Sequence, residues 1–180
     1  MKNTFLLLVL IFTTTVSFAQ KQEKLHLKNA LVIVQLDNPE DRYTLEINMT
    51  ELLTSRGVKA VPSLNYMKQG GDSQILASDS IQQIMKEAGI DTYVIISIRG
   101  YDKRFKKSKR NEDLETILSE GGIFDLYRED MVSISFEFKF FRNGKMVYSD
   151  IRKCGNISDR PTVIKRFRKK VGKRIYKWMK

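Results

Sequence analysis

The stretch from Met131 to Asp150 constrains the fold more than any other part of this 180-residue chain. From Val132 to Phe140 every second residue is apolar, and the residues between them are polar or charged. This alternation is typical of a β-strand with one buried face. Asn143 and Gly144 follow, and both tolerate the positive φ angles of a two-residue type I′ turn. The stretch therefore predicts a β-hairpin whose apolar face the rest of the chain must cover.

Three strands and two helices are predicted ahead of this hairpin. Short apolar runs at 30–36, 58–64 and 92–98 are typical of strands, and the first lacks alternation, as expected of a strand buried on both faces. Apolar residues recur with helical spacing over 39–56 and 79–88, and a glycine follows each of these segments. Strand, helix, strand, helix, strand at this spacing predicts right-handed crossovers between parallel neighbours.

A last helix is predicted over 161–180, and its apolar stripe should pack against the hairpin. The stripe consists of Ile164, Phe167, Val171, Ile175 and Trp178. Pro62 in the second strand predicts that this end of the strand lies at an edge of the sheet or beyond its hydrogen-bonded ladder. The predicted fold class is therefore α/β, with α+β character: one domain of two or three layers and a mixed sheet of about five strands, in the order β-α-β-α-β-insertion-β-β-α.

The first 19 residues are typical of a secretory signal peptide. Lys2 precedes an apolar run over 5–12, and the segment ends in small residues up to Ala19. The apolar run is shorter than the roughly 20 residues of a membrane-spanning helix. Cleavage after Ala19 would leave one domain over 20–180 with no cysteine at its start for lipid attachment. We therefore expect a periplasmic or secreted protein that is soluble after cleavage.

Residues 101–130 interrupt the regular pattern as a basic insertion, and the last helix carries only basic charges after Asp159. The formal net charge of the whole chain is +11. A surface of one sign repels itself, so it predicts an anionic neighbour. Because secretion makes nucleic acid an unexpected partner, we expect an envelope protein or an anionic glycan or lipid surface. The candidate contact residues are Lys103, Arg104, Lys106, Lys107, Lys109, Arg110, Lys169 and Lys173.

Few residues are suited to catalysis. The chain has one histidine, His26, and one cysteine, Cys154, so neither a zinc site nor a disulfide is expected. No glycine-rich phosphate loop follows the first strand, and we expect no cofactor. Cys154 is interpreted as a small, half-buried residue after a strand. Carboxylates in the loops, among them Asp37 and Asp125, leave a small hydrolase with paired acids open as an alternative.

Three segments carry a resemblance to a known group of proteins. They are Leu52–Ser63, Ile84–Asp91 and Asn143–Ser149, which join helix to strand or form the hairpin turn. In these segments the chain resembles bacterial envelope proteins of unknown function, whose α/β domain is similar to the amino-terminal domain of TolB and to the LpoB activator of penicillin-binding proteins. The resemblance implies assembly or scaffolding in the envelope and supplies no catalytic residues. The leading hypothesis is therefore a non-enzymatic binding or scaffolding domain.

Overall fold

The computed structural model describes residues 24–67, 71–108 and 112–180. The predicted signal peptide, residues 1–19, lies outside this part of the chain. In chain order the elements are β1 (Asn29–Gln35), α1 (Pro39–Thr54), β2 (Lys59–Pro62), the 3-10 helices η1 (Ser63–Asn65) and η2 (Ser73–Ala77), α2 (Asp79–Glu87), β3 (Tyr93–Tyr101), α3 (Leu114–Ser119), β4 (Ser133–Arg142), β5 (Lys145–Gly155) and α4 (Arg160–Met179).

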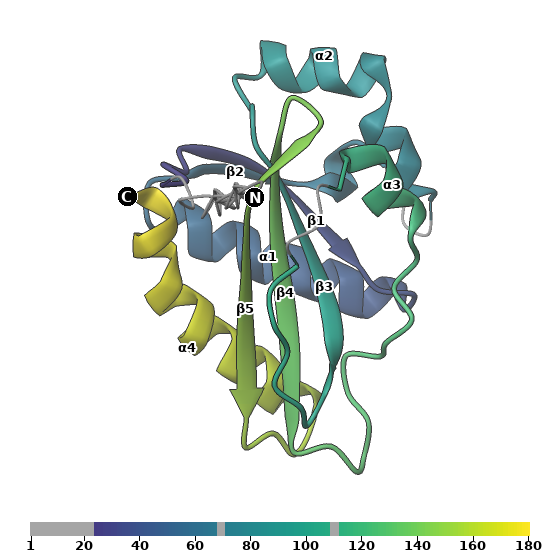
Figure 1. The fold of residues 1–180 in the computed structure, drawn as a ribbon, viewed down its shortest axis with the longest axis vertical. Coiled ribbons are helices and arrows are strands. Elements are labelled where there is room, and N and C mark those ends of the chain that lie inside the picture. Colours follow the sequence, from purple (N-terminus) through teal and green to yellow (C-terminus); the bar gives the residue numbers. More distant parts are fainter. Residues whose placement is uncertain (1–23, 68–70, 109–111) are drawn as a thin grey trace, which may run out of the picture.

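The five strands form one open sheet in the order β2-β1-β3-β4-β5 (Figure 1). β1 pairs in parallel with β2 and β3, whereas β4 is antiparallel to both β3 and β5. With the helices α1 to α4, this arrangement confirms the predicted mixed α/β fold class. The predicted edge position of the strand that ends at Pro62 is also confirmed, because β2 has a neighbour on one side only.

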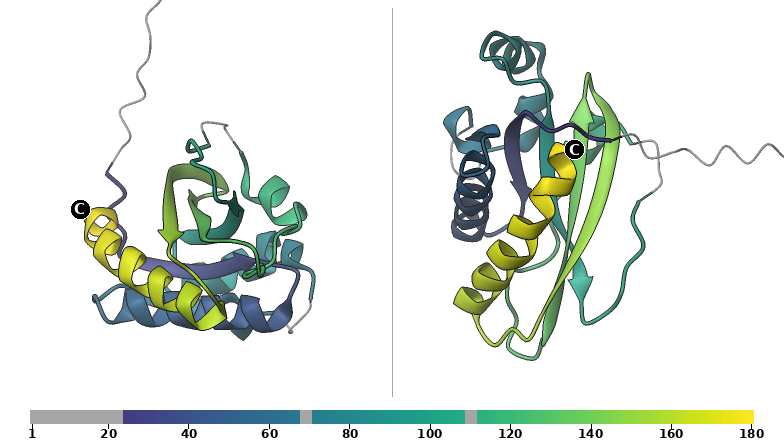
Figure 2. Two further views of the ribbon diagram at one scale, coloured as in Figure 1. Left: turned by 90° about the horizontal axis from the view of Figure 1, so that it is seen from below. Right: turned by 90° about the vertical axis from the view of Figure 1, so that its left-hand side faces the viewer.

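Helices lie on both faces of the sheet around β1 and β3, so the fold has three layers there (Figure 2). Val32 belongs to the buried cluster that contains Leu45 of α1, and the neighbouring Leu31 belongs to a second cluster with Met85 of α2 and Ile117 of α3. Successive residues of a strand face opposite sides of the sheet. β1 is therefore buried on both faces, as its unbroken apolar run predicts.

The inner side of α4 lies in the core, as its apolar stripe predicts. Phe167 is fully buried, and its ring centroid lies 5.1 Å from that of Phe136 and 6.1 Å from that of Phe138, both on β4. Trp178 near the end of the helix is also fully buried, and its backbone carbonyl accepts a hydrogen bond from the Leu27 N–H. α4 is thus held against the sheet at Phe167 and, near its C-terminal end, against the chain that enters β1.

The hairpin forms as predicted, with positive φ angles of 50° at Asn143 and 73° at Gly144. The prediction of a single buried face is wrong for β4, because Ser135, Glu137 and Lys139 are buried as well. The reason is that the described residues 102–108 and 112 lie over this second face, where the Ser108 N–H donates to Glu137 and Glu112 pairs with Lys139. The apolar alternation also begins too early, since Val132 precedes β4 and is 66% exposed.

β2 is shorter than predicted, because the chain turns into η1 directly after Pro62. The buried carboxylate of Glu46 on α1 accepts hydrogen bonds from the Val34 N–H and from the Ser63 hydroxyl, at 3.0 and 2.7 Å. Burial raises the pKa of this carboxyl, and the donated hydrogen bonds oppose the rise. Glu46 thus provides the hydrogen-bond acceptor for the β1 amide of Val34, which lies beyond the end of β2.

Other boundaries differ modestly from the prediction. β3 continues to Tyr101 and β5 to Gly155, and the described part of the connection between β2 and α2 contains η2. Within the insertion at 101–130, residues Leu114–Ser119 fold as the short helix α3. Among the helices of the described residues, none is long and apolar enough to cross a bilayer.

Candidate functional site

The outward side of α4 carries a row of lysines, which are Lys165, Lys169, Lys173 and Lys177. All four are exposed, and none forms an ion pair with another of the described residues. Residues four apart are neighbours on a helix surface, and like charges there are destabilising by about 0.2–0.5 kcal/mol per pair. Lys165–Lys169, Lys169–Lys173 and Lys173–Lys177 are three such pairs. This row opposes the stability of the helix that bears it.

Asp150 on β5 lies below α4 and is 1% exposed. Its carboxylate accepts hydrogen bonds from Arg152 of β5, and from Arg174 and the Trp178 Nε1–H of α4. Burial acts to raise the pKa of the Asp150 carboxyl, but the hydrogen bonds from Arg152 and Arg174 outweigh burial, so the pKa lies below its ordinary value. Asp150 is therefore an ionised acid at the border between the core and the basic side of α4.

The segment that follows β3, residues 102–108, is named the basic strap here. It turns back after β3 and runs along the sheet in front of β4 (Figure 1). The Lys107 Nζ lies 4.0 Å from an Asp150 oxygen and 5.2 Å from the centre of the Tyr148 ring. Partial burial lowers the pKa of Lys107, against the attraction of Asp150, and Arg174 and Arg152 lower it further. The strap thus meets β5 and α4 at Asp150.

Basic side chains from three elements therefore gather along the outer strand β5, and we name this set the basic β5 surface. It consists of Lys103, Arg104, Lys106 and Lys107 from the strap, Arg152 and Lys153 from β5, and Arg166, Lys169, Lys170, Lys173, Arg174 and Lys177 from α4. Within the part of the chain that the structure describes, these elements carry two carboxylates. Asp150 lies among the basic side chains, and Asp102, at the start of the strap, accepts hydrogen bonds from the Ser133 N–H and hydroxyl.

The predicted contact residues have different positions. Lys103, Arg104 and Lys106 are exposed on the strap, and Lys169 and Lys173 are exposed on α4. Lys107 is half-buried beside Asp150, while Lys109 and Arg110 lie outside the described residues. Whether these residues bind a partner stays a prediction.

Sequence reasoning missed Asp150, Arg152 and Arg174 as a group. Asp150 and Arg152 are two residues apart, which places them on one face of a strand, but the predicted hairpin ended at Asp150. A strand extended to Gly155 would have revealed this acid–base pair.

A pocket of about 460 Å³ lies between the strap and the β4–β5 hairpin. It is lined by Arg104, Phe105, Ser135, Ile151, Lys153 and Gly155. The Ser135 hydroxyl is buried and has no hydrogen-bond partner among the described residues. Phe105 lies against Gly100 of β3 so closely that a Cβ atom at Gly100 would come within 2.8 Å of its ring. A glycine at position 100 therefore allows the strap to approach the sheet.

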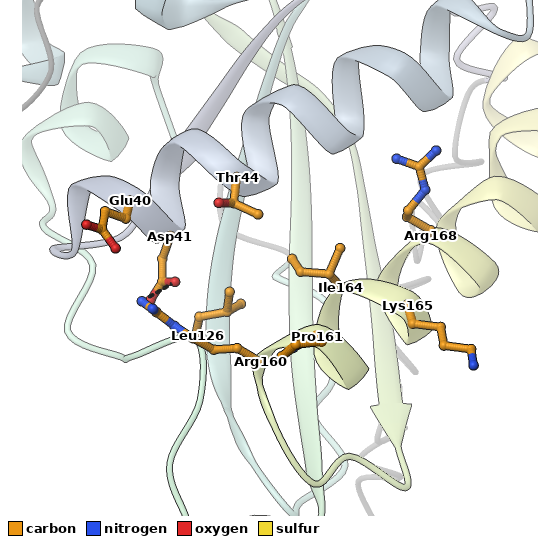
Figure 3. A pocket seen from close by; sticks show the side chains of 9 residues that line it. All are labelled: Glu40, Asp41, Thr44, Leu126, Arg160, Pro161, Ile164, Lys165 and Arg168. Carbon is orange, nitrogen blue, oxygen red and sulfur yellow. Dashed lines mark ion pairs between the residues drawn. The ribbon is translucent and has the colours of Figure 1, made fainter.

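A second hollow of about 540 Å³ lies between the first turns of α1 and α4 (Figure 3). Leu126 and Ile164 give it an apolar lining, and Asp41 of α1 forms an ion pair with Arg160 of α4 across one end. Hydrogen bonding to Asp41 raises the pKa of Arg160. Arg168 bonds to Glu51 of α1 further along. Both arginines that line the hollow thus hold the two helices together.

The hydrolase alternative gains no support from these positions. Asp37 and Asp125 are exposed, and their carboxylates accept no hydrogen bond from any residue in the described ranges. Glu46, whose pKa is raised, lines neither pocket. Cys154 is fully buried, more than predicted, and burial raises the pKa of its thiol to about 11, as expected of an unreactive cysteine. In the described segments no group of His, Cys, Asp and Glu could hold a metal ion.

Comparison with known proteins gives fold-level likenesses only. No protein-family model and no curated protein sequence matches the chain. A PelC dodecamer from Paraburkholderia phytofirmans aligns with 10% identity and a TM-score of 0.48, over 88% of this chain and 91% of that one. A variant of this dodecamer aligns with 13% identity and a TM-score of 0.47, over 87% of this chain and 91% of that one. Lipoprotein GNA1162 from Neisseria meningitidis aligns with 12% identity and a TM-score of 0.42 over 71% of this chain and 80% of that one.

These identities and scores establish no shared function. The resemblance to TolB and LpoB domains also stays a prediction, because no family model matches the chain.

Proposed function

We propose that this chain is a non-enzymatic binding or scaffolding domain of the bacterial cell envelope, which contacts an anionic partner through the basic β5 surface. The observation that carries the proposal is the lysine row on α4: side chains of one sign, all exposed, without acidic partners in the described part of the chain. A solvated helix face usually mixes both signs, because mixed charges stabilise the helix. A row that opposes folding is better explained by binding.

The arrangement of the other basic residues supports the same proposal. The strap and α4 come from distant parts of the sequence, and both meet β5 at Asp150. Asp150 already binds Arg152 and Arg174, so it leaves the outer lysines without compensation. An extended anionic partner would lie over this surface and relieve its repulsion, and the attraction would weaken as salt screens it.

The compartment is part of the proposal. The first 19 residues have the composition of a secretory signal, and cleavage after Ala19 would release the domain into the periplasm or beyond. In that compartment, anionic lipids, acidic glycans and acidic envelope proteins are the available partners.

The test compares charge-reversed variants for binding to vesicles that contain phosphatidylglycerol and to a heparin column. We expect Lys169→Glu with Lys173→Glu to lower the salt concentration at which the protein dissociates from both. Lys86→Glu is the matched control, because Lys86 is also an exposed helical lysine but lies on α2, away from β5. A native circular dichroism spectrum for each variant separates lost binding from lost folding.

Two results would overturn the proposal. One is a wild-type protein that binds neither probe at low salt. The other is a double variant that dissociates at the same salt concentration as wild type, since α4 would then have no part in binding.

A further inference from the structure

We propose that the pocket beneath the basic strap is a binding site for a phosphate monoester. The proposal rests on the proposed function and deepens it, since it names one binding site within the basic β5 surface and the chemical group that fits there. The site is formed by Ser135 and Lys153 from the sheet and by Arg104 and Phe105 from the strap.

The register of the hairpin sets the floor of the pocket. Ser135 of β4 pairs directly with Lys153 of β5, so both side chains lie on the face that the strap covers. On its other side Ser135 pairs with Gly100 of β3, against which the Phe105 ring packs. The strap is therefore held above Ser135, and Arg104, next to Phe105 in the chain, lines the same pocket.

The unpaired groups in this pocket point to a ligand. The Ser135 hydroxyl belongs to a residue that is 1% exposed, and it has no hydrogen-bond partner among the described residues. A buried polar group without a partner is unfavourable, and each such group in a native protein calls for an explanation. Arg104 and Lys153 also form no ion pair within the described ranges. Nearby Glu137, by contrast, is neutralised by Arg99 at 3.4 Å.

These groups match a phosphate monoester in charge and in donors. Its charge at neutral pH is about −1.5 to −2, which the two cations would neutralise. The guanidinium of Arg104 suits two phosphate oxygens at once, the Lys153 ammonium adds a point charge, and the Ser135 hydroxyl can donate to a further oxygen.

The size and lining of the pocket favour an ester over the bare ion. A water molecule takes up about 30 Å³ of liquid, so the pocket of about 460 Å³ has room for much more than one phosphate. Phe105 and Ile151 provide apolar contacts for the organic part of the ester. The phosphate can come from a soluble phosphomonoester or from a lipid headgroup, and the experiment distinguishes these sources.

The experiment measures the binding of inorganic phosphate and phenyl phosphate by calorimetry. We expect phenyl phosphate to bind more tightly than inorganic phosphate, and Lys153→Gln and Arg104→Gln each to weaken its binding about tenfold or more. Lys145→Gln is the matched control, because it removes the same charge from the same strand. Lys145 lies roughly 26 Å along the strand from Lys153, well beyond the screening length of about 8–10 Å at moderate salt, so its loss should change binding less than about twofold.

Ser135→Ala tests the pocket without endangering the fold. Its hydroxyl has no partner among the described residues, so the variant should unfold at the same urea concentration as wild type or a higher one, yet bind phenyl phosphate about tenfold more weakly. Vesicles with and without phosphatidic acid identify the source. If phosphatidic acid vesicles compete with phenyl phosphate for the protein, the pocket is assigned to lipid headgroups. If phenyl phosphate binds and the vesicles do not displace it, the pocket is assigned to soluble esters.

Absence of phosphate binding, or equal losses in Lys153→Gln and Lys145→Gln, would overturn the proposal. Equal losses would mean that the whole basic surface attracts phosphate, which leaves the proposed function standing without the pocket. Conversely, the protein could bind phosphate in a Lys153-dependent way and bind neither vesicles nor heparin. That result would support the pocket and contradict the function proposed for the α4 lysines.

Discussion

The two sides of α4 have opposite effects on the free energy of folding. The side toward the sheet carries Phe167, Val171 and Trp178, all fully buried against β4 and its neighbours. The outward side carries the lysine row, whose members repel one another. One helix therefore holds a stabilising face and a destabilising one, about half a turn apart. The difference teaches that the charge of the lysine row is not needed for folding, which supports the proposal that the row serves binding.

The largest change in stability is expected from Phe167→Ala, on the side of α4 that faces the sheet. Its ring packs against Phe136 and Phe138, and large-to-alanine changes at buried phenylalanines cost about 3–5 kcal/mol. Since whole domains are stable by only about 5–15 kcal/mol, the urea midpoint should fall strongly. An unchanged midpoint would mean that α4 is an appendage, and the comparison between its two sides would fail.

A smaller effect is expected at the border between the two sides, from Asp150→Asn. The change removes the charge that Arg152, Arg174 and Lys107 face, and we expect a loss of about 1–3 kcal/mol at neutral pH.

The pH dependence follows from the lowered pKa of Asp150. A carboxyl whose pKa is lower in the folded state stabilises the protein above its ordinary value of about 3.9, and this contribution is lost as pH falls through the folded-state pKa. The stability gap between wild type and Asp150→Asn should therefore be widest near neutral pH and close in acid. Urea unfolding across pH measures it, and a gap that widens on acidification would show that the sign is wrong.

Much of the fold could be predicted because it follows from local patterns. The helical spacing of Phe167 and Trp178 predicted the buried side of α4, and Asn143-Gly144 predicted the hairpin turn. The burial of Glu137 could not be predicted in the same way. It depends on the basic strap, which crosses β4 from a distant part of the sequence. Polar residues at alternate positions predict a solvated face unless such a covering segment is known.

The candidate site depended on a feature that no local pattern reveals. The turn pairs Arg142 with Lys145 and Phe141 with Met146, but an irregularity between Phe140 and Phe141 then shifts the register by one residue. Without this shift Ser135 would lie opposite Arg152, and every later residue of β5 would face the other side. The bulge thus sends Lys153 toward the strap and Arg152 toward α4.

The smallest effect is expected on the outward side, from the double variant Lys169→Ala and Lys173→Ala. It removes all three like-charge pairs of the row, each destabilising by about 0.2–0.5 kcal/mol, and alanine is the better helix former. The variant should therefore be more stable than wild type, by about 0.5–1.5 kcal/mol at low salt.

Salt separates repulsion from packing as the cause of this small change. At about 1 M salt the screening length falls to about 3 Å, so the gain from removing like charges should shrink to the part that alanine contributes as a helix former. Urea midpoints at low and high salt measure both quantities. If the double variant is instead less stable than wild type at either salt concentration, the aliphatic stems of the lysines contribute packing. The outward side of α4 would then stabilise the fold, and its lysines would no longer point to an anionic partner.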